Sequence, residues 1–174
     1  EGAIVATVPT RDLCAIMLAD AASIQEQEVE SLNRRNQRRG RAAVEPIYRA
    51  ADVERTMRQF RAVPLSDLID VAPGVSARYW EAGHILGSAS IEVIVATATG
   101  PMRILFSGDL GAGGRDYSPD PDGPAGVDHV VLESTYGNRE RPVIDPVTRR
   151  RMLAEELRSA QAAGGPLLIP AFAV

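Results

Sequence analysis

The sequence predicts an α/β fold, in which short strands alternate with helices and the strands in the middle of the chain pair in a mixed or antiparallel way. Two observations carry this prediction. Apolar residues recur at spacings of three and four over residues 10–32, as in an amphipathic helix, whereas residues 90–97 and 102–106 are short runs of strand-forming residues. A turn signal over residues 98–101 separates these two runs and predicts a hairpin.

The N-terminal segment is expected to hold a strand followed by a helix. Residues 3–8 form a β-branched apolar run, which is typical of a buried strand. The helix over residues 10–32 has Thr7 or Thr10 available as its cap. Cys14 falls on the apolar face of this helix, where we expect it to be part of the core.

An arginine-rich segment follows this helix. Five arginines lie within eight positions of a stretch that lacks apolar periodicity, so we predict a mobile loop over residues 33–41. Such a run is typical of a solvated surface, but planar, permanent guanidinium charges also suit a phosphate backbone. The candidates for nucleic-acid contact are Arg34, Arg35, Arg38, Arg39 and Arg41.

The remaining elements follow from the same patterns. A second helix is predicted to begin near Asp52, and a third begins after Pro146 and stops at a pair of glycines. The predicted helices are residues 51–62 and 147–163, the further strands are residues 75–80, 127–132 and 167–170, and the surface loop is residues 111–126.

Composition excludes several classes of protein. The longest apolar runs are far shorter than the roughly 20 residues that cross a bilayer, so we expect no membrane span. The single cysteine excludes an intrachain disulfide framework and predicts a reducing, cytoplasmic location. With a net charge of −4, the chain as a whole is not a polycation that would wrap nucleic acid.

Two glycine-flanked residues are candidates for a metal site. His84 lies in a loop between Gly83 and Gly87, and Asp109 follows Gly108 at the end of an apolar strand. With the hairpin turn centred near residues 99–100, Asp109 is expected opposite Ser90, which places His84 a few residues beyond it. Zinc accepts both imidazole and carboxylate ligands, but a hydrogen-bonded structural pair is the more frequent explanation for two such residues.

A third candidate, Glu133, ends the apolar run that precedes residues 134–137. A carboxylate at the tip of a buried strand is costly unless it is paired. Glu133 is therefore interpreted either as a cap of a loop or helix, or as a carboxylate that orients a ligand imidazole. His129, at the start of the same strand, is expected to be a surface residue without a chemical role.

Three motifs in this order resemble the metallo-β-lactamase fold, and more narrowly its β-CASP branch of RNA- and DNA-processing nucleases. They are Ala82-Gly-His-Ile-Leu-Gly-Ser-Ala-Ser90, Ile104-Leu-Phe-Ser-Gly-Asp-Leu-Gly111 and Leu132-Glu-Ser-Thr-Tyr-Gly137. Residues 10–13, the arginine-rich segment, residues 45–48 and residues 169–174 resemble that branch too. The resemblance implies part of an αββα sandwich with a mixed sheet, followed by the start of a β-CASP insertion.

The resemblance also implies roles for the three candidate residues. His84 matches a ligand of one zinc ion, and Asp109 matches the carboxylate that bridges two zinc ions. Glu133 matches the acidic residue that opens the β-CASP motifs and supports a ligand histidine, so Asp109 and Glu133 are the expected catalytic residues. In the family, two metals activate a hydroxide that attacks a phosphodiester, usually of RNA in bacterial members.

The sequence departs from the family pattern at both ends. The His-x-His-x-Asp-His element expected upstream of Thr10 is absent, and so are the histidines expected after residue 174. We therefore expect an internal fragment, in which residues 1–137 are the latter part of the first metallo-β-lactamase segment and residues 138–174 begin the β-CASP domain. The chain alone is expected to bind metal weakly and to be inactive.

Two alternatives to a nuclease remain from the sequence. The first is a non-catalytic RNA-binding or scaffold relative that keeps the fold but has lost the site. The second is a small-molecule metallo-hydrolase, which would act on a thioester or a lactam and leave oligoribonucleotides intact.

Overall fold

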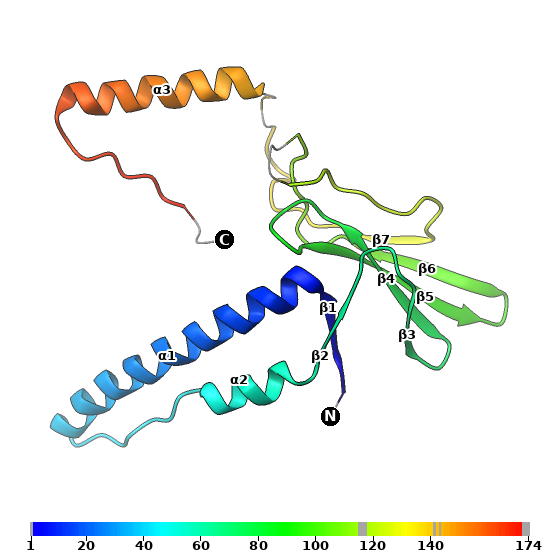
Figure 1. The fold of residues 1–174 in the computed structure, drawn as a ribbon, viewed down its shortest axis with the longest axis horizontal. Coiled ribbons are helices and arrows are strands. Elements are labelled where there is room, and N and C mark those ends of the chain that lie inside the picture. Colours follow the sequence, from blue (N-terminus) through cyan, green and yellow to red (C-terminus); the bar gives the residue numbers. More distant parts are fainter. Residues whose placement is uncertain (1, 115–117, 141, 143, 172–174) are drawn as a thin grey trace. The chain divides into compact units, whose positions relative to one another are not determined.

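A computed structural model describes residues 2–114, 118–140, 142 and 144–171, so the last three residues of the family-like segment 169–174 lie outside it. The chain divides into two compact units, Glu1–Glu133 and Ser134–Val174, and each is described by itself. Three helices and seven strands are assigned among the described residues (Figure 1).

Helix α1 spans Val8–Arg38 and starts two residues earlier than predicted, with Thr7, one of the two predicted cap candidates, as its N-cap and Pro9 in its first turn. The prediction of a mobile loop over residues 33–41 is wrong for residues 33–38, because the helix continues through Arg38. It ends before Gly40, whose φ is +65°. Arginine and glutamine favour helix without needing a packing partner. The side chain of Asn33 also bonds both backbone groups of Val44, at 2.8 and 2.9 Å, and holds the returning chain against the helix.

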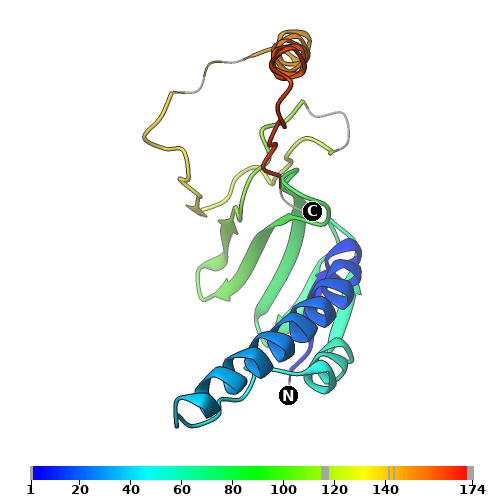
Figure 2. The same ribbon diagram turned by 90° about the vertical axis from the view of Figure 1, so that its left-hand side faces the viewer.

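Helix α2 spans Ala50–Met57 and lies beside α1 (Figures 1 and 2), but it is shorter than predicted. The expected helical residues 60–62 belong instead to strand β2, Phe60–Val63, which pairs in parallel with strand β1, Ile4–Thr7. Hydrogen bonds to β1 satisfy the backbone of these residues, so tertiary pairing overrides the local helical pattern. The predicted first strand is confirmed.

The second sheet has the strand order β3-β4-β5-β6-β7. Its first four strands are antiparallel, and β7 is parallel to β6. The mixed α/β class is confirmed and is consistent with part of a metallo-β-lactamase fold. The strands are β3 Ile69–Ala72, β4 Val75–Glu81, β5 Ala89–Thr97, β6 Gly100–Phe106 and β7 His129–Val131.

The predicted hairpin between β5 and β6 is present, but its register differs from the prediction. Thr97 pairs with Gly100, so the turn is Ala98-Thr99 rather than one centred near residues 99–100. Ser90 consequently lies beside Ser107, to whose carbonyl its hydroxyl donates at 2.8 Å. Asp109 is therefore not opposite Ser90 but two residues beyond that position.

One face of this sheet holds a buried ion pair that the sequence did not single out. Glu92 is fully buried in β5, where it accepts hydrogen bonds from Trp80 Nε1 at 2.9 Å and Arg103 Nε at 2.7 Å. The guanidinium of Arg78 lies over the Trp80 ring, 5.7 Å from its centroid. Arg103 is held in turn by the carbonyls of residues 125 and 126. This network therefore fixes strands β4, β5 and β6 to the loop that precedes β7.

The opposite face of the sheet is joined to β1. The hydroxyl of Tyr79 donates to the carbonyl of Val5 at 2.7 Å, and burial raises the pKa of the Tyr79 phenol, so it remains a donor. The apolar core is small, and the face of α1 expected to be buried is partly exposed, since Met17 is 51% and Ile24 48% accessible. Cys14, expected in the core, is half-buried.

The second unit contains helix α3, Pro146–Ala163, which confirms the predicted third helix. Asp145 caps it by accepting from the backbone of Thr148 at 3.0 Å and of Val147 at 2.9 Å, and hydrogen bonds from Thr148, then from Val147, lower the Asp145 pKa. The strand expected over residues 167–170 is absent, because no strand in the described part of this unit is available to pair with it.

Within the described residues, none of the three helices combines the length and apolarity that crossing a bilayer requires.

Candidate functional site

Residues 82–88, which we call the His84 loop, connect β4 to β5. Gly83 and Gly87 have φ values of +61° and +84°, and these left-handed conformations turn the chain tightly on either side of His84. The hydroxyl of Ser88 accepts from the backbone N–H groups of His84, at 3.0 Å, and of Ile85, at 3.2 Å. The loop is thus closed by its own side chains, and His84 is half-buried within it.

Residues 107–111, which we call the Asp109 loop, follow β6 and contact the His84 loop through the backbone. The N–H of Gly111 donates to the carbonyl of Ala82 at 2.8 Å. A Cβ atom on Gly111 would overlap the carbonyl of Gly83 and lie 3.0 Å from the backbone nitrogen of His84. The two loops that carry His84 and Asp109 therefore meet at one end of the sheet, although the register that led us to expect this was wrong.

Glu133, two residues after the exposed strand β7 ends, is bonded to the Asp109 loop. Its Oε1 atom accepts from the N–H of Leu110 at 2.7 Å, and its own N–H donates to Ser107 Oγ at 3.0 Å. Of the two interpretations from the sequence, the loop cap accounts for these bonds. Asp109 itself is exposed, whereas Glu133 is half-buried. A role for Glu133 on a ligand imidazole stays a prediction.

The other histidine is placed as predicted. His129 is exposed at the start of β7, on an edge of the sheet. Among the described residues, His, Cys, Asp and Glu side chains do not come together in any group of three that could hold a metal ion. His84 and Asp109 are residue types that bind zinc, but a zinc site needs three or four protein ligands, and the described part of the chain does not bring that many together.

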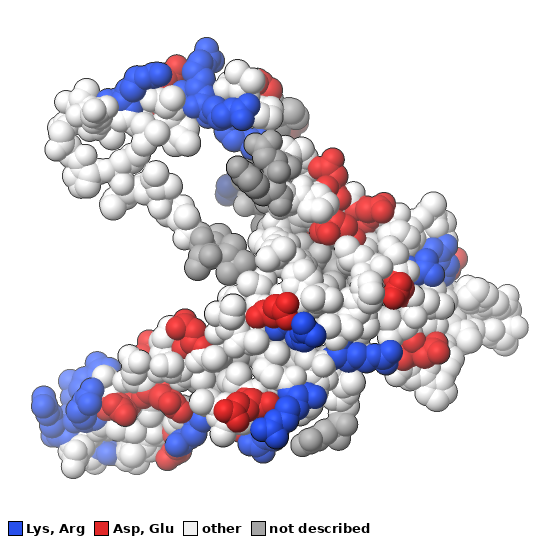
Figure 3. All heavy atoms as spheres, viewed as in Figure 1, with Lys and Arg blue, Asp and Glu red and all other residues white. Residues whose placement is uncertain are grey.

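The five candidate arginines gather at the far end of α1, where Figure 3 shows a concentration of positive charge. All five are exposed. Arg34 and Arg38 are four residues apart, so they lie on the same side of the helix. Arg35 and Arg39, the C-cap residue, are also four residues apart. Arg34 is 3.8 Å from Glu30, too far for this exposed pair to neutralise it strongly. The backbone of Arg34, Arg35 and Arg38 is thus helical, Arg39 caps the helix, and only Arg41 lies beyond its end, so most of the predicted loop is a charged helix end instead.

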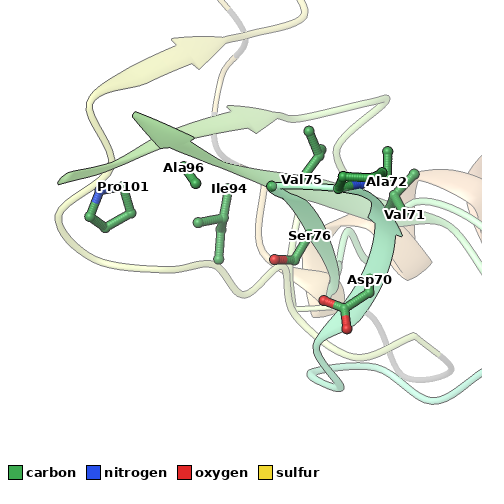
Figure 4. A pocket seen from close by; sticks show the side chains of 10 residues that line it. Asp70, Val71, Ala72, Val75, Ser76, Ile94, Ala96 and Pro101 are labelled. Carbon is green, nitrogen blue, oxygen red and sulfur yellow. The ribbon is translucent and has the colours of Figure 1, made fainter. Parts of the chain in front are cut away.

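An open hollow lies at the opposite end of the sheet from the His84 loop (Figure 4). Its lining includes Asp70, Val75, Ile94 and Pro101, which come from strands β3, β4, β5 and β6 respectively. Asp70 is its single ionisable group, so the hollow lacks the acid and base pair that catalysis would require.

Sequence reasoning overlooked the contact between Gly87 and the start of α1. The hydroxyls of Thr7 and Thr10 both lie 2.9 Å from the Gly87 carbonyl oxygen. The sequence did indicate both threonines, because each was a candidate for the helix cap. A helix cap, however, concerns only the local geometry of the helix. It gives no indication of a contact with a residue about 80 positions away.

Comparisons with known proteins give relatives along the whole chain. It is 32% identical over 175 residues to the ribonuclease TTHA0252 of Thermus thermophilus, covering 100% of this chain and 35% of the ribonuclease. It is 28% identical to the transcription termination factor FttA of Thermococcus kodakarensis, covering 100% of this chain and 24% of the factor. An RNase J-like protein of Methanocaldococcus jannaschii is 31% identical over 131 residues, with 73% of this chain and 30% of that protein covered.

The chain is thus homologous to proteins named for RNA cleavage and for transcription termination, and it spans about a third or less of their length. No protein-family model matches it.

Proposed function

We propose that this chain is part of an RNA-processing hydrolase of the metallo-β-lactamase fold and its β-CASP branch, which cleaves phosphodiester bonds of RNA. The observation that carries the proposal is the backbone contact between the His84 loop and the Asp109 loop, because it places an imidazole and a carboxylate at one end of the sheet. Relatives named as ribonucleases support the choice of RNA as substrate.

We further propose that the intact protein is zinc-dependent, with His84 and Asp109 as two of its ligands. Two bound zinc ions would supply a hydroxide at neutral pH and stabilise the leaving oxygen. The described residues do not complete such a site, so the remaining ligands would come from a longer protein of which residues 1–137 and 138–174 are parts of two domains. The chain alone is then expected to bind metal weakly and to be inactive.

In this proposal the residues of the chain have distinct tasks. His84 and Asp109 present their side chains from two loops whose backbones are in direct contact. Glu133 acts on the Asp109 loop by holding the Leu110 N–H, and so limits how far Asp109 can move. Such support matters because catalytic groups must be held close to their productive geometry.

The first test replaces the proposed ligands in the whole protein. We expect His84→Ala and Asp109→Asn each to lower hydrolysis of an oligoribonucleotide by more than about 100-fold, the upper end of the loss caused by removing only an outer partner of a ligand. Both variants should also lose zinc, measured by elemental analysis. His129→Ala is the matched control, because His129 is exposed on the sheet edge, and it should retain wild-type zinc and activity.

The same assay separates the alternatives. A wild-type protein that binds RNA without cutting it would be a non-catalytic relative, and one that hydrolyses a thioester or lactam but no oligoribonucleotide would be a small-molecule hydrolase. Either result would contradict the proposal. Full activity in His84→Ala would contradict the assignment of that ligand.

We also propose that the arginines at the end of α1 contact the RNA backbone. Replacing Arg34, Arg35, Arg38 and Arg39 with alanine should weaken RNA binding by the whole protein and flatten its salt dependence, because each lost phosphate contact on single-stranded RNA removes about 0.7 from the slope of log K against log salt. Binding titrations at several salt concentrations measure this slope.

The control for this prediction replaces Arg49 and Arg55, two exposed arginines at the start of α2 and on it that pair closely with Glu45 and Asp52. Their removal should leave the slope unchanged. If the slope is also unchanged in the quadruple variant, the arginines at the end of α1, including Arg41, form only a solvated surface.

The cellular location of the whole protein is proposed from the cysteine count alone. A single half-buried cysteine suits a reducing environment, and we propose a cytoplasmic location for the whole protein.

A further inference from the structure

Three oxygen atoms meet where the His84 loop reaches the start of α1. The hydroxyls of Thr7 and Thr10 lie 2.9 Å from each other, and each lies 2.9 Å from the carbonyl oxygen of Gly87. A carbonyl oxygen can accept two hydrogen bonds, so the Gly87 carbonyl has a donor available on each side. This Thr–Gly contact joins residues about 80 positions apart.

At this contact the backbone of Gly87 also approaches the first turn of α1 closely. Gly87 has a φ of +84°, and a Cβ atom there would lie 2.7 Å from both the nitrogen and the Oγ1 atom of Thr10. Only glycine fits this position without displacing the first turn of the helix. The end of the His84 loop is therefore seated directly on the N-terminus of α1.

The two threonines do different things. Thr7 is the N-cap of α1, accepts from the N–H of Thr10 at 3.4 Å and is 5% exposed. Thr10 lies in the first helical turn, and its hydroxyl is not needed for the cap. A change that removes only the Thr10 hydroxyl thus weakens the hold on Gly87 while the cap acceptor of Thr7 stays in place.

His84 lies between two points at which its loop is held. On one side the Gly83 N–H donates to the Glu81 carboxylate at 2.8 Å, and within the loop Ser88 holds the backbone of His84. The Thr–Gly contact holds the other end. Without it, Gly87 loses its hydrogen bonds to Thr7 and Thr10, and the loop gains conformational freedom that the site would have to remove at each binding event.

We infer that Thr7 and Thr10 are positioning residues for His84, which act through the Gly87 carbonyl. The inference rests on the proposed function only for the role of His84 as a zinc ligand. The arrangement of the loop can be tested without any activity. For the reaction, loss of positioning should appear mainly in kcat, since neither threonine is proposed to touch the substrate.

The test uses the fact that the chain holds two histidines. In Thr10→Val the hydroxyl is replaced by a methyl group of similar size, and we expect the His84 imidazole signals in nitrogen–proton spectra to shift and broaden, while those of exposed His129 keep their positions. Thr10→Ser restores the hydroxyl and should restore the His84 signals. Thr97→Val is the matched control, because Thr97 also donates to a glycine carbonyl, that of Gly100 on the other side of the hairpin turn.

Two results would overturn the inference that the threonines position His84. Unchanged His84 signals in Thr10→Val would overturn the inference, and so would a disturbance that Thr10→Ser fails to repair. If Thr10→Val does not fold, Thr10→Ala removes the same hydroxyl with a smaller side chain and is judged by the same two criteria.

Activity of the whole protein gives a second readout. We expect kcat in Thr10→Val to fall about 10-fold or more, the range for losing an outer partner of a ligand, with KM unchanged. A wild-type protein without nuclease activity would contradict the proposed function, while the imidazole spectra would still decide whether the threonines position His84.

Discussion

Glu92→Ala is expected to destabilise the chain by about 3 kcal/mol. Removing one partner of a buried ion pair costs about 3–5 kcal/mol, because the other charge is left uncompensated, and the lower value applies here since Arg103 keeps 30% of its side chain exposed. The Trp80 N–H would also lose its acceptor. Urea unfolding followed by tryptophan fluorescence measures this, because Trp80 is the only tryptophan of the chain.

Two companion variants identify the cause of the effect. Glu92→Gln keeps an acceptor for Trp80 but removes the charge, so its loss of stability should be smaller than that of Glu92→Ala. Glu54→Ala breaks an exposed pair in which Glu54 is 3.8 Å from Arg58, and it should cost no more than about 1 kcal/mol. If Glu92→Ala cost as little as Glu54→Ala, the buried network would contribute no more than a surface pair.

Elements with local signals could be predicted from the sequence. The turn residues of the β5–β6 hairpin predict it, and the glycine pair that begins at Gly164 predicts where α3 ends. Elements that depend on distant partners could not. Residues 60–63 become a strand because β1 pairs with them, and residues 167–170 remain outside a sheet where no such partner is described.

The candidate site shows the same division. The glycines around His84 and Asp109 indicated tight loops, and the structure has tight turns at Gly83, Gly87 and Gly108. The bond from Leu110 to Glu133 could not be predicted, because it depends on how the chain after β6 lies against the end of β7. The same is true of Glu92, since a glutamate among apolar residues gives no indication of which arginine will meet it.

Gly111→Ala is expected to separate the two loops of the candidate site. An added methyl group would overlap the carbonyl oxygen and carbon of Gly83, and because these are backbone atoms they cannot move aside by changing a rotamer. Gly83 has little room to retreat, because Pro119 and Pro121 lie behind it, with the Pro119 carbonyl oxygen 2.5 Å from where its own Cβ would stand. We therefore expect the Gly111–Ala82 hydrogen bond to break.

The consequence should be a loss of more than about 100-fold in RNA hydrolysis by the whole protein, because a displacement of about 1 Å at a catalytic group is enough for such a loss. Gly123→Ala is the matched control: it lies in the same surface loop, is not in a left-handed conformation, and its methyl group would meet nothing closer than 4.0 Å. Retained activity in Gly111→Ala would show that the contact between the loops is not what holds His84 near Asp109. Loss of activity with a folded chain, judged by Trp80 fluorescence, would show that this backbone contact sets the geometry of the site.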